Sequence, residues 1–497
     1  MSKKKRIWTL ILTGAFSVVL AVIVIFLIRT DNPLDLAARN SNTIKIVATY
    51  NYNTQTLDAI QVVDYKNRTN YDKNEIKFHI YANAYKENAR FPAVSSEDIR
   101  NGVFPNGPSF GGITIKRVAI NRTLIQHVMT GYDDTVLKVP LASTLRPGQS
   151  LSIQIDYVVQ LANIAHRLGF TDRVVNLGNF YPVPVIKQNS QWLTFAYSYN
   201  GDPFFNDLHN FNVTLTKPDR MIMASSGIVL REGRRDGMRT TVVQSRAIRD
   251  WAAVLSPYFN VRTRTVDRVI VSYFYLDDAD PNRSLSTSVR AKQTFSRLFV
   301  PFPYRTLNIV QTDFLHGGME YGELVYISTS ITSREEIDRV IIHEIAHQWW
   351  YGIIGNDQAR HSWLDEGLAE FSTLLFFDEN PGWTTIERSD HITAFRNNLA
   401  TFTSTVRSFG MTPNLNMSRD LHAFNSTPEY IYVAYVRGFL LFADLESWVG
   451  PAKMRSALQN LAKENKFGII TPNCLIRSFE NTTNLQLGLF FDHFLRG

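Results

Sequence analysis

Cysteine is nearly absent from this sequence, which has a single one, Cys474, among 497 residues. One cysteine excludes an intrachain disulfide, and it also excludes zinc fingers or ribbons built on cysteine ligands. Because a free cysteine packs as a small hydrophobic residue, we expect Cys474 to be buried.

Low-complexity tracts and internal repeats are also missing. Hydrophobic residues make up 44% of the chain and charged residues 20%, which excludes a disordered or collagen-like protein. A chain of 497 residues is long enough for two to three domains.

Acidic residues are absent from the first 30 positions, and this placement explains most of the net charge of +7. Five of the 52 basic residues lie there, which leaves 47 basic against 45 acidic residues in the remainder, a net charge of +2. Because nucleic-acid binding needs a strongly basic surface, we expect no nucleic-acid partner.

One long uncharged hydrophobic run occupies residues 7–28. As a helix of about 1.5 Å per residue it would be about 33 Å long, enough to cross a bilayer. Lys3, Lys4, Lys5 and Arg6 precede it, and basic flanks stay in the cytoplasm. A cleaved signal peptide is the alternative, but such peptides have shorter apolar regions. We therefore predict a single-pass cell-membrane protein with a cytoplasmic flank at 1–6, an anchor at 7–28, a linker at 29–42, and the rest of the chain outside the cytoplasm.

Two further regions follow the linker. Residues 43–265 contain runs with period-two alternation, such as 151–155 and 211–215, separated by glycine- and proline-containing turns. This pattern predicts a β-rich domain, either a sandwich or a large twisted sheet. Helical segments begin near residue 286, and we assign residues 266–497 to a second domain.

The second domain contains the segment His343-Glu344-Ile345-Ala346-His347. Ser333 and Glu336 form a plausible capping box at the start of its helix. The i, i+4 spacing places both imidazoles on one face, where they can bind one Zn²⁺. Glu344 lies between them, in a position to hold the metal-bound water.

A second helix is predicted around Glu366, with 18 residues between His347 and Glu366. Packed antiparallel to the first helix, it can bring a carboxylate to complete a site of two histidines and one glutamate with an open position for water. Glu370, one turn later, is either an acceptor for a ligand histidine or part of a solvated helix face.

These motifs resemble those of the aminopeptidase N-like zinc exopeptidases, the gluzincin aminopeptidases, whose catalytic domain is related to thermolysin. Gly317-Gly318-Met319-Glu320-Tyr321 resembles the family's exopeptidase motif, and Tyr435-Val436-Arg437-Gly438-Phe439 resembles the stretch with its catalytic tyrosine. Together with the N-terminal transmembrane helix predicted above, the resemblance implies a multidomain α+β protein with a mostly β N-terminal domain of sandwich-like or saddle-like form and a thermolysin-like α/β zinc peptidase domain.

The resemblance also implies a role for each residue. One Zn²⁺ per chain would be bound by His343, His347 and Glu366, with Glu344 as general base. The Tyr435 hydroxyl would stabilise the oxyanion. Glu320 would bind the ammonium group of a free peptide N-terminus, while Gly317, Gly318 and Met319 would contact the substrate backbone.

The sequence departs from the family at two points. Tyr321 replaces the usual asparagine, and the chain stops at Gly497 without the large helical C-terminal domain of many members. From the apolar run, the zinc motif and the exopeptidase motif together, we expect a membrane-anchored zinc aminopeptidase that acts on peptides with a free N-terminus. A zinc endopeptidase with an open cleft and an inactive peptide-binding envelope protein are the alternatives. The oligomeric state is not predicted.

Overall fold

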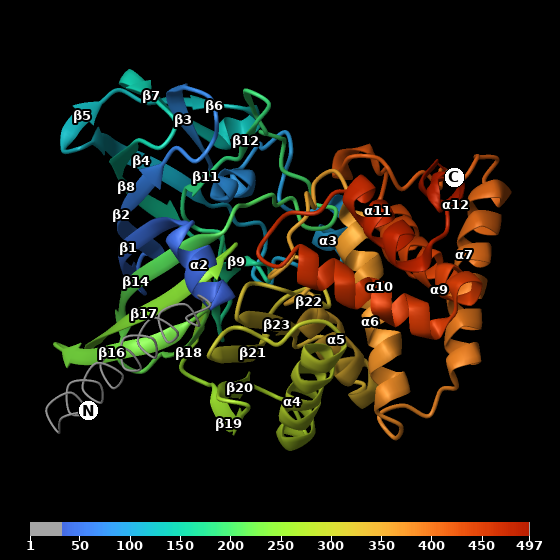
Figure 1. Ribbon diagram of the computed structural model, residues 1–497. Helices are drawn as coiled ribbons and strands as arrows, with labels where there is room; N and C mark the ends of the chain where they lie inside the picture. The colour runs from blue at the N-terminus through green and yellow to red at the C-terminus, as the bar shows by residue number, and fades with distance from the viewer. Residues whose placement is uncertain (1–31, 497) are drawn as a thin grey trace, which may run out of the picture.

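The computed structural model describes residues 32–496 of the chain. Its N-terminal half is β-rich and its C-terminal half largely helical, and the two halves lie side by side (Figure 1). This confirms the predicted mixed β-rich and helical architecture. The predicted anchor at 7–28 lies outside the described residues. Within residues 32–496, no helix is long and apolar enough to cross a membrane.

A single eight-stranded sheet organises the N-terminal half. Tyr50, at 0% exposure, and the other inward-facing residues of β1 alternate with exposed ones, the pattern expected of a half-buried strand. The strand β1 pairs in parallel with β14, and the other neighbours are antiparallel. The order is β16 (Ile228–Arg235), β17 (Met238–Ile248), β14 (His209–Pro218), β1 (Asn42–Asn51), β2 (Thr56–Lys66), β8 (Ser150–Gln160), β4 (Gly112–Ile120) and β5 (Thr123–Ile125).

Smaller sheets and short helices complete this half. The helix α2 (Pro33–Arg39) is capped by Asn32 and ion-paired to β17 through Asp35 and Arg246, and α3 (Ser96–Arg100) is capped by Ser95. One sheet contains β11 (Val183–Pro184), β3 (Lys73–His79), β7 (Val136–Leu145) and β6 (Val128–Thr130); a second contains β15 (Ile222–Ser225), β18 (Ala252–Ser256), β10 (Val175–Gly178) and β9 (Leu168–Phe170); a hairpin is formed by β12 (Lys187–Gln188) and β13 (Gln191–Trp192).

The C-terminal half begins with a five-stranded sheet. Its order is β19 (Asn260–Val266), β20 (Val269–Tyr275), β21 (Thr306–Thr312), β23 (Leu324–Ser328) and β22 (Gly318–Met319). The sheet starts six residues before the predicted boundary at 266, because β19 forms a hairpin with β20. At the opposite edge, β22 pairs antiparallel with β23 and carries the predicted exopeptidase motif.

Helices build the rest of this half. The helix α5 (Arg334–Ala346) packs on β22 and β23, and α6 (Ser362–Glu379) packs on α5 and α9 (Gly438–Val449). A π-helix over Ile431–Arg437 joins α8 (Thr427–Tyr430) to α9. The other α-helices of this half are α4 (Pro281–Leu298), α7 (Arg388–Ser408), α10 (Pro451–Glu464), α11 (Pro472–Thr483) and α12 (Gly488–Arg496). Cys474, on α11, is half-buried, whereas we expected it to be buried.

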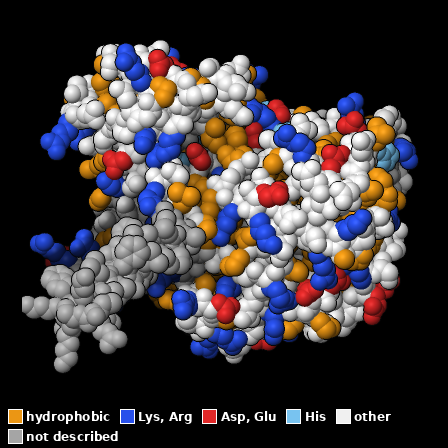
Figure 2. Space-filling view, in the orientation of Figure 1, with side chains coloured by type: hydrophobic (Ala, Val, Ile, Leu, Met, Phe, Trp, Pro, Cys, Tyr) orange, Lys and Arg blue, Asp and Glu red, His pale blue; other side chains and the backbone are white. Residues whose placement is uncertain are grey.

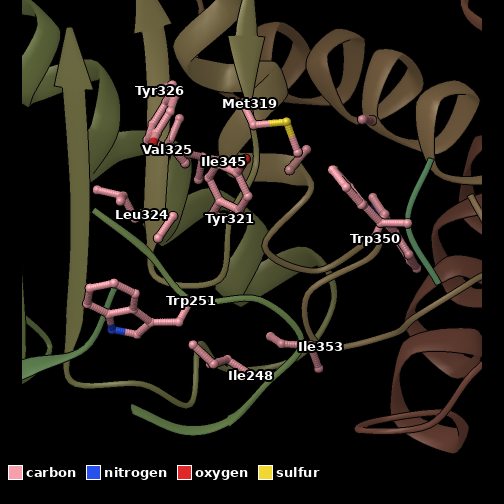
Figure 3. Packing of buried hydrophobic residues seen from close by; sticks show 14 of the residues in the cluster. Ile248, Trp251, Met319, Tyr321, Leu324, Val325, Tyr326, Ile345, Trp350 and Ile353 are labelled. Carbon is pink, nitrogen blue, oxygen red and sulfur yellow. The ribbon is translucent and has the colours of Figure 1, made fainter. Parts of the chain in front are cut away.

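The two halves share one hydrophobic core. Ile248 and Trp251 of the N-terminal half lie close to Leu324 and Tyr321 of the C-terminal half (Figure 3). The buried Arg249 guanidinium joins three segments: it donates to the carbonyl oxygens of Asn206 at 3.0 Å, Tyr351 at 2.6 Å and Gly468 at 2.7 Å. The face of the molecule in Figure 2 shows interspersed basic and acidic side chains, as the near-neutral composition predicts.

Candidate active site

The residues of the predicted zinc site meet between α5 and α6. The side chain of Ser333 caps α5 by accepting from the amide of Glu336. The Nε2 atoms of His343 and His347 lie 3.0 Å apart. Oε2 of Glu366 lies 3.3 Å from the first and 3.2 Å from the second.

These distances suit a tetrahedral ion. Ligand atoms about 2.0–2.1 Å from a tetrahedral zinc ion lie about 3.3 Å from one another. All three side chains are buried, so the ligand atoms are shielded from competing water. The arrangement of His343, His347 and Glu366 therefore fits Zn²⁺.

The outward nitrogens of both histidines face acceptors. Nδ1 of His347 hydrogen-bonds the carbonyl oxygen of Trp350 at 3.1 Å, and Nδ1 of His343 lies 3.3 Å from Oε1 of Glu370. Arg339 donates to that same Oε1 at 3.1 Å. Acceptors in these places direct each Nε2 toward a metal ion. Glu370 is thus a buried carboxylate beside His343 and does not lie on a solvated helix face.

Ion pairing keeps the two carboxylates of this site ionised. Burial opposes ionisation of Glu366, but the charges of His347 and His343 lower its pKa to about 2. Burial likewise opposes ionisation of Glu370, while Arg339 and His343 lower its pKa to about 2. Both groups are therefore available as acceptors at neutral pH.

Glu344 lies against the edge strand β22. A Cβ atom at Gly318 would lie 2.3 Å from Oε1 of Glu344, so only glycine permits this approach. The buried Oε2 of Glu344 has no hydrogen-bond partner among the described residues. Burial raises the pKa of Glu344 to about 7, a value suited to accepting and returning a proton near neutral pH.

A cavity of about 550 Å³ opens beside these groups. It is lined by Gly317, Gly318, His343, Glu344 and Tyr435, together with residues of the N-terminal half and of α7. The side chain of Met319 is 1% exposed and points into the hydrophobic core (Figure 3). In the edge strand β22, Met319 therefore has only its backbone available for the predicted contact with a substrate.

Tyr435 reaches the site from the π-helix. Its hydroxyl donates to Oε1 of Glu366 at 2.6 Å, and its ring stacks on His343 with centroids 5.8 Å apart. The approach depends on two glycines: a Cβ at Gly438 would lie 3.0 Å from Cα of Gly367. Because α6 and α9 cross so closely there, the residues beside the crossing, Glu366 and Tyr435, come within hydrogen-bond distance.

Comparison with known proteins agrees with this geometry. Residues 284–494 match the model of the Peptidase family M1 domain. The chain therefore carries a peptidase family M1 domain over these residues. The chain is 22% identical over 276 residues to Aminopeptidase M1-B of Oryza sativa subsp. japonica. This match covers 51% of this chain and 30% of that protein. It is also 26% identical over 197 residues to Aminopeptidase N of Canis lupus familiaris, and this match covers 35% of this chain and 20% of that protein.

The M1 fold extends over the whole described chain. The M1 zinc metallopeptidase of Deinococcus radiodurans matches with a TM-score of 0.62 at 15% identity, over 92% of both chains. A mutant of that protein bound to a Tyr-Ser-Ala substrate matches with a TM-score of 0.63 at 15% identity, over 92% of this chain and 93% of that one. By contrast, this chain spans less than a third of the length of the curated aminopeptidases just described.

Glu320 of the predicted exopeptidase motif is buried. It is 3% exposed, and its Oε1 accepts from Nε2 of Gln358 at 2.7 Å. Burial raises the pKa of Glu320 to about 7, and the nearby carboxylates of Glu344 and Glu366 add to the effect. Glu320 is absent from the described residues that line the cavity; it lies behind the lining.

Three residues near Glu320 were missed by sequence reasoning. Gln348, the residue after His347, donates to the carbonyl oxygen of Tyr321 at 3.0 Å and holds this loop. Gln358 donates to Asp365 as well as to Glu320, both at 2.7 Å. Asp202, from the N-terminal half, lines the cavity and pairs with Arg167 at 2.8 Å. Only the position of Gln348 beside the zinc motif could have indicated such a role.

Tyr321, the departure from the family motif, points away from the metal ligands. Its fully buried ring lies in the core between the two halves (Figure 3). A Cβ at Gly178 would lie 2.0 Å from the Tyr321 hydroxyl, so a glycine in the N-terminal half provides the space. The larger side chain is thus accommodated without entering the cavity.

Proposed function

We propose that the protein is a zinc aminopeptidase that removes residues from the free N-terminus of peptides. The observation that carries the proposal is the set of three ligand atoms 3.0–3.3 Å apart beside the unpaired oxygen of Glu344. Its relatives in family M1 are named aminopeptidases. A zinc ion bound by His343, His347 and Glu366 would polarise the scissile carbonyl and lower the pKa of a water molecule.

The side chains and backbone around the metal position have separate proposed roles in the reaction. Oε2 of Glu344 faces no other partner, so it accepts the proton of the attacking water and later returns it to the leaving amine. The Tyr435 hydroxyl donates to the oxygen that becomes negative during attack. The backbone of Gly317 and Gly318 lies at a sheet edge, where an extended peptide can align by main-chain hydrogen bonds.

Two buried carboxylates, Asp202 of the cavity lining and Glu320 near it, favour a free N-terminus. Glu320 and Asp202 interact electrostatically with each other, and a peptide ammonium group carries the opposite charge. An N-acetylated peptide offers no such charge. This pair of carboxylates therefore supports exopeptidase cleavage over cleavage within a chain.

The proposal includes a membrane anchor at 7–28, with the peptidase domain outside the cytoplasm. Its support is the length of the apolar run and the basic residues before it. Alkaline extraction of membranes should leave the full-length protein in the pellet, and a protease added outside the cell should cleave the peptidase domain. Release of the protein by alkali would contradict the anchor without affecting the proposed activity.

The activity is tested with purified full-length protein in detergent. We expect about one zinc ion per chain, hydrolysis of aminoacyl reporter substrates, loss of activity with a chelator, and little cleavage of the same reporters after N-acetylation. The variant Glu344→Gln should bind zinc but lack activity. Equal activity of this variant and the wild type would contradict the assigned chemistry.

A zinc endopeptidase is the second candidate. It is favoured by one observation, the absence of Glu320 from the described residues that line the cavity. If a substrate cannot reach the Glu320 carboxylate, a peptide with a free N-terminus would bind no more tightly than an internal segment of a chain. Equal cleavage of free and N-acetylated peptides would select the endopeptidase.

A further inference from the structure

A second tyrosine hydroxyl points at the same oxygen as Tyr435. Tyr430 is 3% exposed, and its hydroxyl lies 3.4 Å from Oε1 of Glu366, to which it can donate. The rings of Tyr430 and Tyr435 are perpendicular, with centroids 5.6 Å apart. Two hydroxyl donors therefore converge on Oε1, while Oε2 faces the histidines.

The π-helix over Ile431–Arg437 explains this convergence. In an α-helix, residues five apart point about 140° away from each other. The i→i+5 hydrogen bonds of a π-helix bring residues five apart onto nearly the same face. Tyr430 and Tyr435 are five apart, so the local change of helix type aims both rings at Glu366.

The N-terminal half also makes room for the Tyr430 hydroxyl. A Cβ at Gly201 would lie 2.4 Å from the hydroxyl oxygen, and the φ of Gly201 is +57°, a conformation that favours glycine. Gly201 is followed by Asp202, and both line the cavity. The segment at Gly201 thus contacts the hydroxyl group of Tyr430, although the two residues lie more than 200 positions apart in the chain.

The Tyr435 hydroxyl has only one proton to donate. In this structure it donates that proton to Oε1 of Glu366, yet the proposed reaction requires the same proton at the substrate oxygen. While Tyr435 serves the substrate, Oε1 would lose its short hydrogen bond unless another donor replaced it. Tyr430 is the buried hydroxyl within reach of that oxygen.

We propose that Tyr430 is a positioning residue that holds Oε1 of Glu366 while Tyr435 donates to the substrate. The hydrogen bond keeps the ligand carboxylate oriented with Oε2 toward the metal. This inference rests on the proposed function for the role of Tyr435. Its consequence for metal binding does not depend on catalysis, because Glu366 must be oriented in either case.

The test uses the full-length variant Tyr430→Phe, which removes one oxygen atom and keeps the ring. The matched control is Tyr432→Phe, on the same helical segment, whose ring stacks on Phe402 instead. Zinc affinity is measured by competition with a chromogenic chelator, and kcat and KM with an aminoacyl reporter. Loss of a residue that orients a ligand typically weakens metal binding or activity by about 10- to 100-fold.

We expect Tyr430→Phe to weaken zinc binding and lower kcat within that range, with KM changed less than about two-fold, and Tyr432→Phe to match the wild type. Cobalt substitution should show an altered visible spectrum for Tyr430→Phe only. Gly201→Ala displaces the same hydroxyl while keeping every side chain of the site, so it should also weaken zinc binding.

Wild-type zinc affinity in both Tyr430→Phe and Gly201→Ala would overturn the inference. If Tyr430→Phe does not fold, the zinc affinity of Gly201→Ala decides the question alone. Absence of peptidase activity in the wild type would refute the proposed function. The zinc measurements would still decide whether Tyr430 orients Glu366.

Discussion

Adding one methyl group at Gly318 should separate catalysis from metal binding. The Cβ of Gly318→Ala would lie 2.3 Å from Oε1 of Glu344. Because an ordinary contact between such atoms is at least about 3.4 Å, the carboxylate must move by about 1 Å. Misplacement of a catalytic group by that distance can cost about 100-fold in rate.

We therefore expect Gly318→Ala to lower kcat about 100-fold, equivalent to about 2.7 kcal/mol of activation free energy. Zinc content should be unchanged, because the three atoms nearest to the new methyl group all belong to Glu344, which is not one of the candidate ligands. The neighbouring substitution Gly317→Ala is a matched control, since its Cβ would meet only Val340 Cγ2 at 3.9 Å. It should retain wild-type kcat.

The assay measures kcat, KM and zinc content for both variants, with circular dichroism to check the fold. A double-mutant cycle with Glu344→Asp adds a second check, because shortening the carboxylate side chain relieves the clash. The two substitutions should then be non-additive, with the double variant faster than the product of the single effects predicts. Equal kcat in Gly318→Ala and Gly317→Ala would refute the assignment of Glu344 as the proton acceptor.

The remaining predictions concern the ligands, the oxyanion, the substrate N-terminus and the domain contact. Glu366→Gln should lower zinc content to well below one per chain, measured by atomic emission; stoichiometric zinc would show that the ligand is another residue. Tyr435→Phe should lower kcat by about 10²- to 10³-fold, with zinc still bound because Tyr430 remains as a donor to Oε1 of Glu366, and an unchanged kcat would assign oxyanion stabilisation elsewhere. Glu320→Gln should raise KM for free-N-terminus reporters and leave N-acetylated peptides unaffected; equal effects would argue against ammonium binding. Arg249→Met leaves three buried carbonyl oxygens without their donor and should lower the free energy of unfolding by about 3 kcal/mol, read from denaturant titration, in which an unchanged midpoint would contradict the role of this contact.

The zinc ligands could be predicted from the sequence because their geometry is mostly local. Helical spacing alone places His343 and His347 on one face. Glu366 required only that a second helix pack against the first, and α6 does so. Tyr435 was predicted through the resemblance of its segment to a family motif. The structure gives the physical reason for its place beside Glu366, which is the close crossing of α6 and α9 at Gly367 and Gly438.

Other features of the site depend on contacts between distant segments. Asp202 and Gly201 lie more than 130 residues before the zinc helix, and no pattern near them indicates the cavity they line. The depth of Glu320 and the inward direction of Met319 follow from how β22 packs at the sheet edge. Periodicity cannot predict such packing, because it reports which face of an element is apolar and not what covers it.

The sequence by itself determined the candidate metal ligands, the place of Glu344 between two of them and the two-part architecture after residue 42, because these depend on residue type and on spacing within one helix or strand. The tertiary structure alone decided that the buried carboxylates of Asp202 and Glu320 lie close enough to interact electrostatically and that two tyrosines share one oxygen of Glu366. It also decided that Tyr321 fills the space above Gly178. The physical reason is that these contacts require a close approach of backbones far apart in the chain, and such an approach exists only once the core has packed.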